Sequence, residues 1–208
     1  MEYNCPNCGA PIQFRSKVSI YTTCTYCRSN IIRRDMDLEK IGEVSELLND
    51  MSPFQVGTTG QYLGVGFRLL GRIKVGYSGG MWSEWFVLFD DNREGWLAEA
   101  QGLYMMSFEQ KNAPIPPFKS TQVGQKIAFE NDRFVVDDRR KITYLGSEGE
   151  LPYVFKQGFK GASIDLRGPN KKFLNFLYGP DGDQAFAGYY VPFEEFQFKD
   201  LRPLDGWN

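Results

Sequence analysis

Hydrophobic and polar positions alternate over most of the chain, which is the pattern of β-strands. Short runs rich in aromatic and branched side chains are separated by turn sequences such as Ser78-Gly79-Gly80. The runs predict strands at Phe67–Gly71, Arg72–Tyr77, Trp82–Asp90, Gly95–Gln101 and Leu103–Phe108. The pattern resumes after a proline-rich break at 114–117 and continues to about residue 192. We therefore expect a mainly β domain over residues 52–208, either barrel-like or sandwich-like.

Within this domain, the segment from Trp82 to Phe89 alternates strictly enough to assign its two faces. The even positions from Trp82 to Leu88 share one face, and Glu84 is the acid among them. Trp85 lies on the other face. Glu84 could be an acid with a shifted pKa or a salt-bridge partner of Arg72, and the salt bridge is the simpler reading. Four residues thus mark a candidate partner or ligand surface: Arg72, Trp82, Glu84 and Trp85.

The β domain contains an internal repeat. Seven residues recur 67 positions later, and after an insertion around 148–158 five more face identical or similar residues at an offset of 77. The matched pairs include Phe67 with Phe134 and Trp96 with Phe173. A half of this size folds only marginally by itself, so we expect halves of about 52–118 and 119–200 to share a core.

Residues 35–51 separate this domain from the N-terminal segment. They place Leu38, Ile41, Val44 and Leu48 at near-helical spacing, and Ser52-Pro53 would end a helix. The pattern predicts a short linker helix.

All four cysteines lie near the N-terminus, at Cys5, Cys8, Cys24 and Cys27. Two C-x2-C pairs at this separation are a strong signal for a four-cysteine zinc ribbon over residues 1–34. Four ligands complete the coordination of the metal, so we expect a structural zinc. Iron has the same ligand preference and stays an alternative, and two disulfides are the less favoured reading in a reducing compartment.

Charge and composition narrow the function. The formal net charge is −2 and the chain has no histidine, which excludes Ser-His-Asp and Cys-His chemistry within it. The ribbon is basic, and the segment after it is acidic, so the two could neutralise each other. Nucleic acid could instead bind the ribbon through its basic and aromatic side chains. The candidate contacts are Arg15, Lys17, Tyr26 and Arg28, with Tyr21 beside them.

The N-terminal residues carry neither the basic start nor the apolar stretch of a signal peptide, and no apolar run is long enough to span a membrane. We expect a cytoplasmic protein without membrane insertion.

Several short stretches resemble a bacterial family known as domain of unknown function 4178, in a subgroup with an N-terminal zinc ribbon. The resemblance rests on their order and spacing: Cys5-Pro-Asn-Cys-Gly-Ala-Pro-Ile, Phe14-Arg-Ser, Ser52-Pro-Phe, Val56-Gly, Gly71-Arg-Ile, Trp82-Ser-Glu-Trp, Trp96-Leu, Gly149-Glu150-Leu151-Pro152 and Ile164-Asp-Leu. It implies a bacterial cytoplasmic protein with no assigned activity.

The function expected from the sequence is a non-enzymatic scaffold or adaptor whose β domain binds a protein partner. Nucleic-acid binding through the ribbon is the alternative, and an enzyme acting through carboxylates or lysines comes third.

Overall fold

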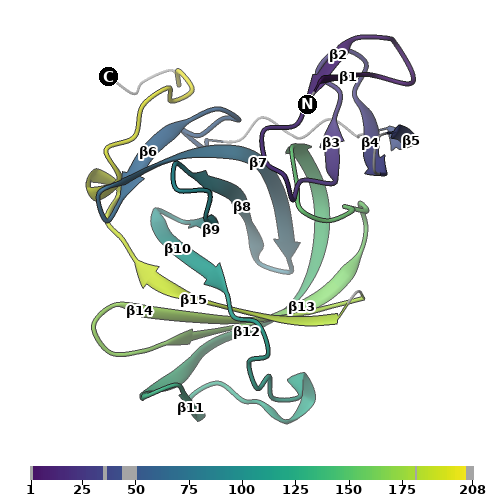
Figure 1. The fold of residues 1–208 in the computed structure, drawn as a ribbon. Helices are drawn as coiled ribbons and strands as arrows, with labels where there is room; N and C mark the ends of the chain where they lie inside the picture. Colours follow the sequence, from purple (N-terminus) through teal and green to yellow (C-terminus); the bar gives the residue numbers. More distant parts are fainter. Residues whose placement is uncertain (1, 35–36, 44–50, 181, 205–208) are drawn as a thin grey trace.

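The computed structural model describes residues 2–34, 37–43, 51–180 and 182–204, and these residues form a mainly β protein (Figure 1). The N-terminal ribbon has two small antiparallel sheets. One pairs β1 (Glu2–Asn4) with β2 (Pro11–Gln13), and the other orders β3 (Tyr21–Thr23), β4 (Ser29–Arg34) and β5 (Asp37–Glu43). The purple ribbon strands lie together at one end of the β domain in Figure 1.

The helix predicted over 35–51 is wrong where the structure describes it. Residues Asp37–Glu43 form strand β5, antiparallel to β4, with Arg33 opposite Leu38. The free edge of β4 offers backbone hydrogen bonds, and Gly42 weakens a helix by roughly 1 kcal/mol relative to alanine. The basic and acidic segments do meet here, since Arg34 and Glu39 form an ion pair of 2.7 Å. Residues 35–36 and 44–50 of the predicted helix lie outside the described residues.

The β domain consists of two successive sets of five strands with two short 3-10 helices. The first set is β6 (Thr59–Tyr62), β7 (Val65–Tyr77), β8 (Gly80–Phe89), β9 (Glu94–Ala100) and β10 (Leu103–Glu109). The second is β11 (Lys126–Phe129), β12 (Asp132–Gly149), β13 (Lys160–Arg167), β14 (Lys172–Gly179) and β15 (Gly182–Tyr190). The helices are η1 (Phe118–Ser120) and η2 (Phe193–Phe196).

All ten strands belong to one antiparallel sheet. Its order is β11-β12-β13-β14-β15-β10-β9-β8-β7-β6, and β12 also pairs with β7. This extra pairing joins β7–β10 and β12–β15 into a closed ring of hydrogen-bonded neighbours, with β6 and β11 outside it (Figure 1). The two strands expected at 67–71 and 72–77 are one strand, β7, whose pairing with β8 is interrupted by a bulge between Leu69 and Gly71.

The register of the first strand pair in each set follows the offset of 67 in the predicted repeat. Phe67 pairs with Gly60 in the first set, and Phe134 pairs with Ile127 in the second. The second pair is therefore the first pair moved 67 positions along the chain. Both phenylalanines are buried. Where the halves meet, Gly76 pairs with Thr143, its own equivalent at the offset of 67.

Three hydrophobic clusters build the core of the β domain. The first fills part of the ring interior and includes Phe86, Ile73 and Ile142. The second covers the outer face of the first set of strands, where Phe54 and Phe196 pack on Trp85 and its neighbours. The third covers the outer face of the second set, beneath the connector that carries Phe118. The ring therefore has apolar side chains on both faces, which explains the two-sided hydrophobic runs in the sequence.

The ribbon is attached to the closed end of the ring by the segment after β12. Tyr21 and Leu151 form an isolated antiparallel bridge, and the fully buried Tyr21 ring belongs to the interior cluster. Gly71 has no room for a side chain, because a Cβ there would lie 2.1 Å from the carbonyl oxygen of Glu150. This close approach positions Glu150 beneath the ribbon.

Candidate metal centre and interior cavity

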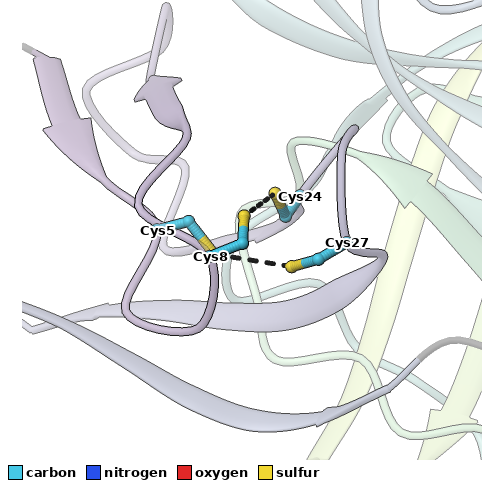
Figure 2. A group of neighbouring side chains, drawn as sticks. All are labelled: Cys5, Cys8, Cys24 and Cys27. Carbon is cyan, nitrogen blue, oxygen red and sulfur yellow. Dashed lines mark hydrogen bonds between the residues drawn. The ribbon is translucent and has the colours of Figure 1, made fainter.

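The four cysteines converge on one point from two turns of the ribbon (Figure 2). All four sulfurs lie within 4.8 Å of one another, and the Cys5–Cys27 and Cys8–Cys24 Sγ···Sγ distances are 3.6 and 3.8 Å. Sulfurs at about 2.3 Å from a zinc ion at the centre of a tetrahedron are about 3.8 Å apart. A disulfide bond would be about 2.0 Å. The cluster could therefore hold a metal ion, and its geometry is consistent with zinc.

The two turns that present the cysteines are built alike. In the first, the N–H of Cys5 donates to Ala10 and the N–H of Gly9 donates to Cys5. The second repeats both hydrogen bonds between Cys24, Arg28 and Ser29. The residue after each second cysteine has a positive φ, 76° at Gly9 and 57° at Arg28. This conformation favours glycine, so the sequence identified the first turn more readily than the second.

Polar neighbours of Cys27 favour the thiolate form that metal binding requires, whereas burial and hydrogen bonding by the other cysteines raise the pKa of Cys8. The Sγ of Cys27 lies 3.2 Å from the Ser29 hydroxyl oxygen. Hydrogen bonding by Ser29 and Asn7 lowers the pKa of Cys27 to about 5. A metal held by four protein ligands would have no open position for a substrate, and its role would be to stabilise the fold.

A second site lies inside the ring, in a cavity of about 230 Å³. All eight ring strands contribute to its lining, and Tyr153 adds a ring from the segment that carries the ribbon. A single water molecule needs only about 10–15 Å³ of cavity volume, so this cavity is much larger than a water site. The exposed lining residues mark the mouth, at the end away from the ribbon: Met81, Gln101, Leu103, Asp137 and Arg167.

Two acids face this cavity from opposite halves of the ring. The Glu84 carboxylate accepts a hydrogen bond of 2.9 Å from the indole N–H of Trp82. The Asp165 carboxylate accepts one of 2.7 Å from the Asn175 amide. Each side chain keeps some surface open to the cavity but is surrounded by protein. Burial raises the pKa of Glu84 to about 7 and that of Asp165 to about 6, and the charge of Asp165 adds to the shift of Glu84.

Residues 55–193 match the family model described as Domain of unknown function (DUF4178). The chain belongs to this family. No curated protein and no solved structure matches the chain. The DUF4178 region contains every residue that lines the cavity, from Tyr77 to Tyr190, and also Glu150. The four cysteines lie before it, so the ribbon precedes the family domain.

The arginines of the cavity are paired with other acids of the DUF4178 domain. Arg167 forms an ion pair of 2.7 Å with Asp137. Arg140 forms one with Asp138 and lies 3.8 Å above the ring of Tyr77. In the part of the chain that the structure describes, neither Glu84 nor Asp165 has a lysine or arginine within ion-pair distance. Two acids of the lining thus remain without a paired cation.

The structure separates the four residues predicted as one partner or ligand surface. Trp82 and Glu84 share one face of β8, as the alternation predicted, and this face lines the cavity. Arg72 and Trp85 are buried on the opposite face, where Arg72 pairs with Glu148 at 2.8 Å and lies 4.9 Å above the Trp85 ring. The salt bridge predicted between Arg72 and Glu84 is therefore wrong, because adjacent pairs of a sheet point to opposite faces.

Asp165 is the functional candidate that the sequence did not reveal. It lies on β13, 81 positions after Glu84, and only ring closure brings the two strands around one cavity. A signal was present, since Asp165 is an acid between the two apolar residues Ile164 and Leu166.

The predicted nucleic-acid contacts also fall into two places. Arg15 and Lys17 are exposed and line a groove of the ribbon together with Arg33 and Arg34. Tyr26 and Arg28 are exposed on the second cysteine turn and do not line that groove. Tyr21, expected beside them, is buried, and its hydroxyl lies 3.1 Å from that of Ser147.

Proposed function

We propose that this protein is a non-enzymatic small-molecule binding protein of the bacterial cytoplasm. Its DUF4178 domain holds the ligand inside the strand ring, and its ribbon, held by a structural zinc, closes the far end. The observation that carries the proposal is the interior cavity with its two unpaired acids. Small-molecule sites are concave, mostly apolar and carry a few convergent polar groups, and those acids have shifted pKa values as in many functional sites.

The shape of the site indicates that the domain binds a small molecule rather than a protein partner. The lining residues Trp82, Trp96 and Phe186 are only partly buried by protein, and they surround the cavity rather than an open face. The adaptor role expected from the sequence stays a prediction.

Within the described ranges, no helix has the length and apolar character needed to span a lipid bilayer.

The test of this proposal is equilibrium dialysis of the full chain against a metabolite extract of a bacterial cell. Ala98 on β9 lines the cavity and lies opposite Glu84 in the strand register, so Ala98→Phe would fill the space. We expect at least one small molecule to accumulate with the wild type and not with Ala98→Phe. Equal distribution for both proteins would overturn the proposal.

Nucleic-acid binding is a second candidate, favoured by the basic groove of the ribbon. Four cationic side chains line it: Arg15, Lys17, Arg33 and Arg34. True phosphate contacts weaken steeply with salt. Titration of labelled single- and double-stranded probes at two salt concentrations, with Lys17→Gln beside the wild type, tests this candidate. Salt-independent binding, or equal binding by Lys17→Gln, would contradict it.

A further inference from the structure

The charges that line the cavity do not balance. Four acids and two arginines face it, and the two ion pairs at the mouth use both arginines. Within the described residues this leaves Glu84 and Asp165, which accept hydrogen bonds from the neutral donors Trp82 and Asn175 respectively. Burying a carboxylate without a cation is costly. A positively charged ligand would remove that cost.

Aromatic rings surround the same space. Trp82 comes from β8 and Trp96 from β9, and Phe173 and Tyr190 lie across the ring on β14 and β15. The Trp96 ring is stacked on Tyr153 at 5.8 Å, which fixes its orientation at the closed end. Aromatic faces attract organic cations, and tryptophan does so most strongly. They also provide apolar surface for the carbon skeleton of a ligand.

We propose that the ligand of this cavity is a small organic cation, with an ammonium or guanidinium group that contacts Glu84 and Asp165 and an apolar part that packs on Trp82 and Trp96. This inference rests on the proposed function and adds the chemical class of the ligand. The raised pKa values of both acids support it, because burial, rather than a neighbouring cation, has the largest effect on each carboxyl group.

Three probes of the same size test the inference: benzylammonium, benzyl alcohol and benzoate differ mainly in charge. Their affinities for the full chain are measured by isothermal titration calorimetry at pH 7.5. We expect benzylammonium to bind at least tenfold more tightly than benzyl alcohol, and benzoate to bind least. Equal or tighter binding of benzyl alcohol or benzoate would overturn the cation inference while supporting a ligand cavity. Absence of binding by all three probes would overturn the inference too, and the dialysis experiment decides the proposed function independently.

Two variants that remove the negative charge of one acid each test whether Glu84 and Asp165 contact the cationic group of the probe. Glu84→Gln and Asp165→Asn keep the shape of each side chain, so we expect each to weaken benzylammonium at least fivefold and to leave benzyl alcohol within twofold. Glu109→Gln is the matched control, since Glu109 is exposed and lies outside the cavity. Thermal unfolding curves show which variants are folded, and either neutralising variant is sufficient for the test. Equal weakening of both probes, or equal loss in Glu109→Gln, would contradict the inference.

Discussion

Arg15 donates its backbone N–H to both carboxylate oxygens of Glu150, each at 3.0 Å. Glu150 is buried and also accepts the N–H of Ser16 at 3.2 Å. The ribbon and the DUF4178 domain therefore meet through an acid of the domain that binds backbone groups of the ribbon. Because side chains of the ribbon take no part in these bonds, their identity matters less here than the backbone conformation.

The first prediction concerns this junction. Glu150→Ala removes the acceptor of buried N–H groups, and each unsatisfied donor costs about 1–3 kcal/mol. We expect faster hydrogen exchange at the amides of Arg15 and Ser16 and a lower free energy of unfolding. Glu150→Gln keeps one acceptor oxygen and should lie between Glu150→Ala and the wild type. Unchanged exchange at both amides in Glu150→Ala would contradict the assignment.

A second prediction concerns the metal. Elemental analysis should find one zinc per chain, and Cys24→Ser should unfold residues 1–34 while most β structure remains. The structure adds a consequence, because Tyr21 of the ribbon packs in the interior cluster. Loss of this packing should cost about 2–3 kcal/mol and lower the Tm of the β domain by about 5–10 °C. A β domain with an unchanged Tm would show that it does not depend on the ribbon.

The pH dependence of stability gives a third prediction. The pKa of Glu84 is raised from 4.5 to about 7 in the folded protein, so the folded state binds the proton more tightly than the unfolded state. Stability should therefore fall as pH rises through this window, by about 2 kcal/mol between pH 5 and pH 8. Glu84→Gln should remove most of this slope, leaving the smaller part due to Asp165. Parallel pH profiles of Glu84→Gln and wild type, measured by urea unfolding, would contradict the buried acid.

A fourth prediction concerns the two halves of the ring. Residues 52–118 contain β7 and β10 but lack their partners β12 and β15. Each of these strands would have a free edge, and the interior face would be exposed to solvent. The fragment expressed separately should be insoluble or unfold without cooperativity. Cooperative unfolding of the fragment, followed by circular dichroism, would indicate two independent domains.

Local patterns predicted the metal cluster and most of the strands. The cysteine spacing identified four residues that cluster in the structure, and the alternation from Trp82 onward assigned both faces of β8 correctly. The helix predicted for the linker was wrong because Leu38 and Ile41 fit either a helix or a strand. Pairing with the edge of β4 decides between the two. The placement of Asp165 and Glu84 around one cavity, and that of Glu150 beneath Arg15, could not be predicted, since each depends on strand pairing over long sequence separations.

The most direct test of the cavity as a ligand site uses two neighbouring methionines of β10. Met105 lines the cavity, whereas Met106 is buried in the outer cluster on the opposite face of the same strand. With ¹³C-methyl methionine and benzylammonium, nuclear Overhauser effects between the probe ring and each methyl group are measured, and Met105→Leu assigns the signals. We predict contacts from the probe to the Met105 methyl and none to that of Met106. Contacts to Met106 instead, or a saturated complex without contacts to Met105, would contradict a ligand inside the ring.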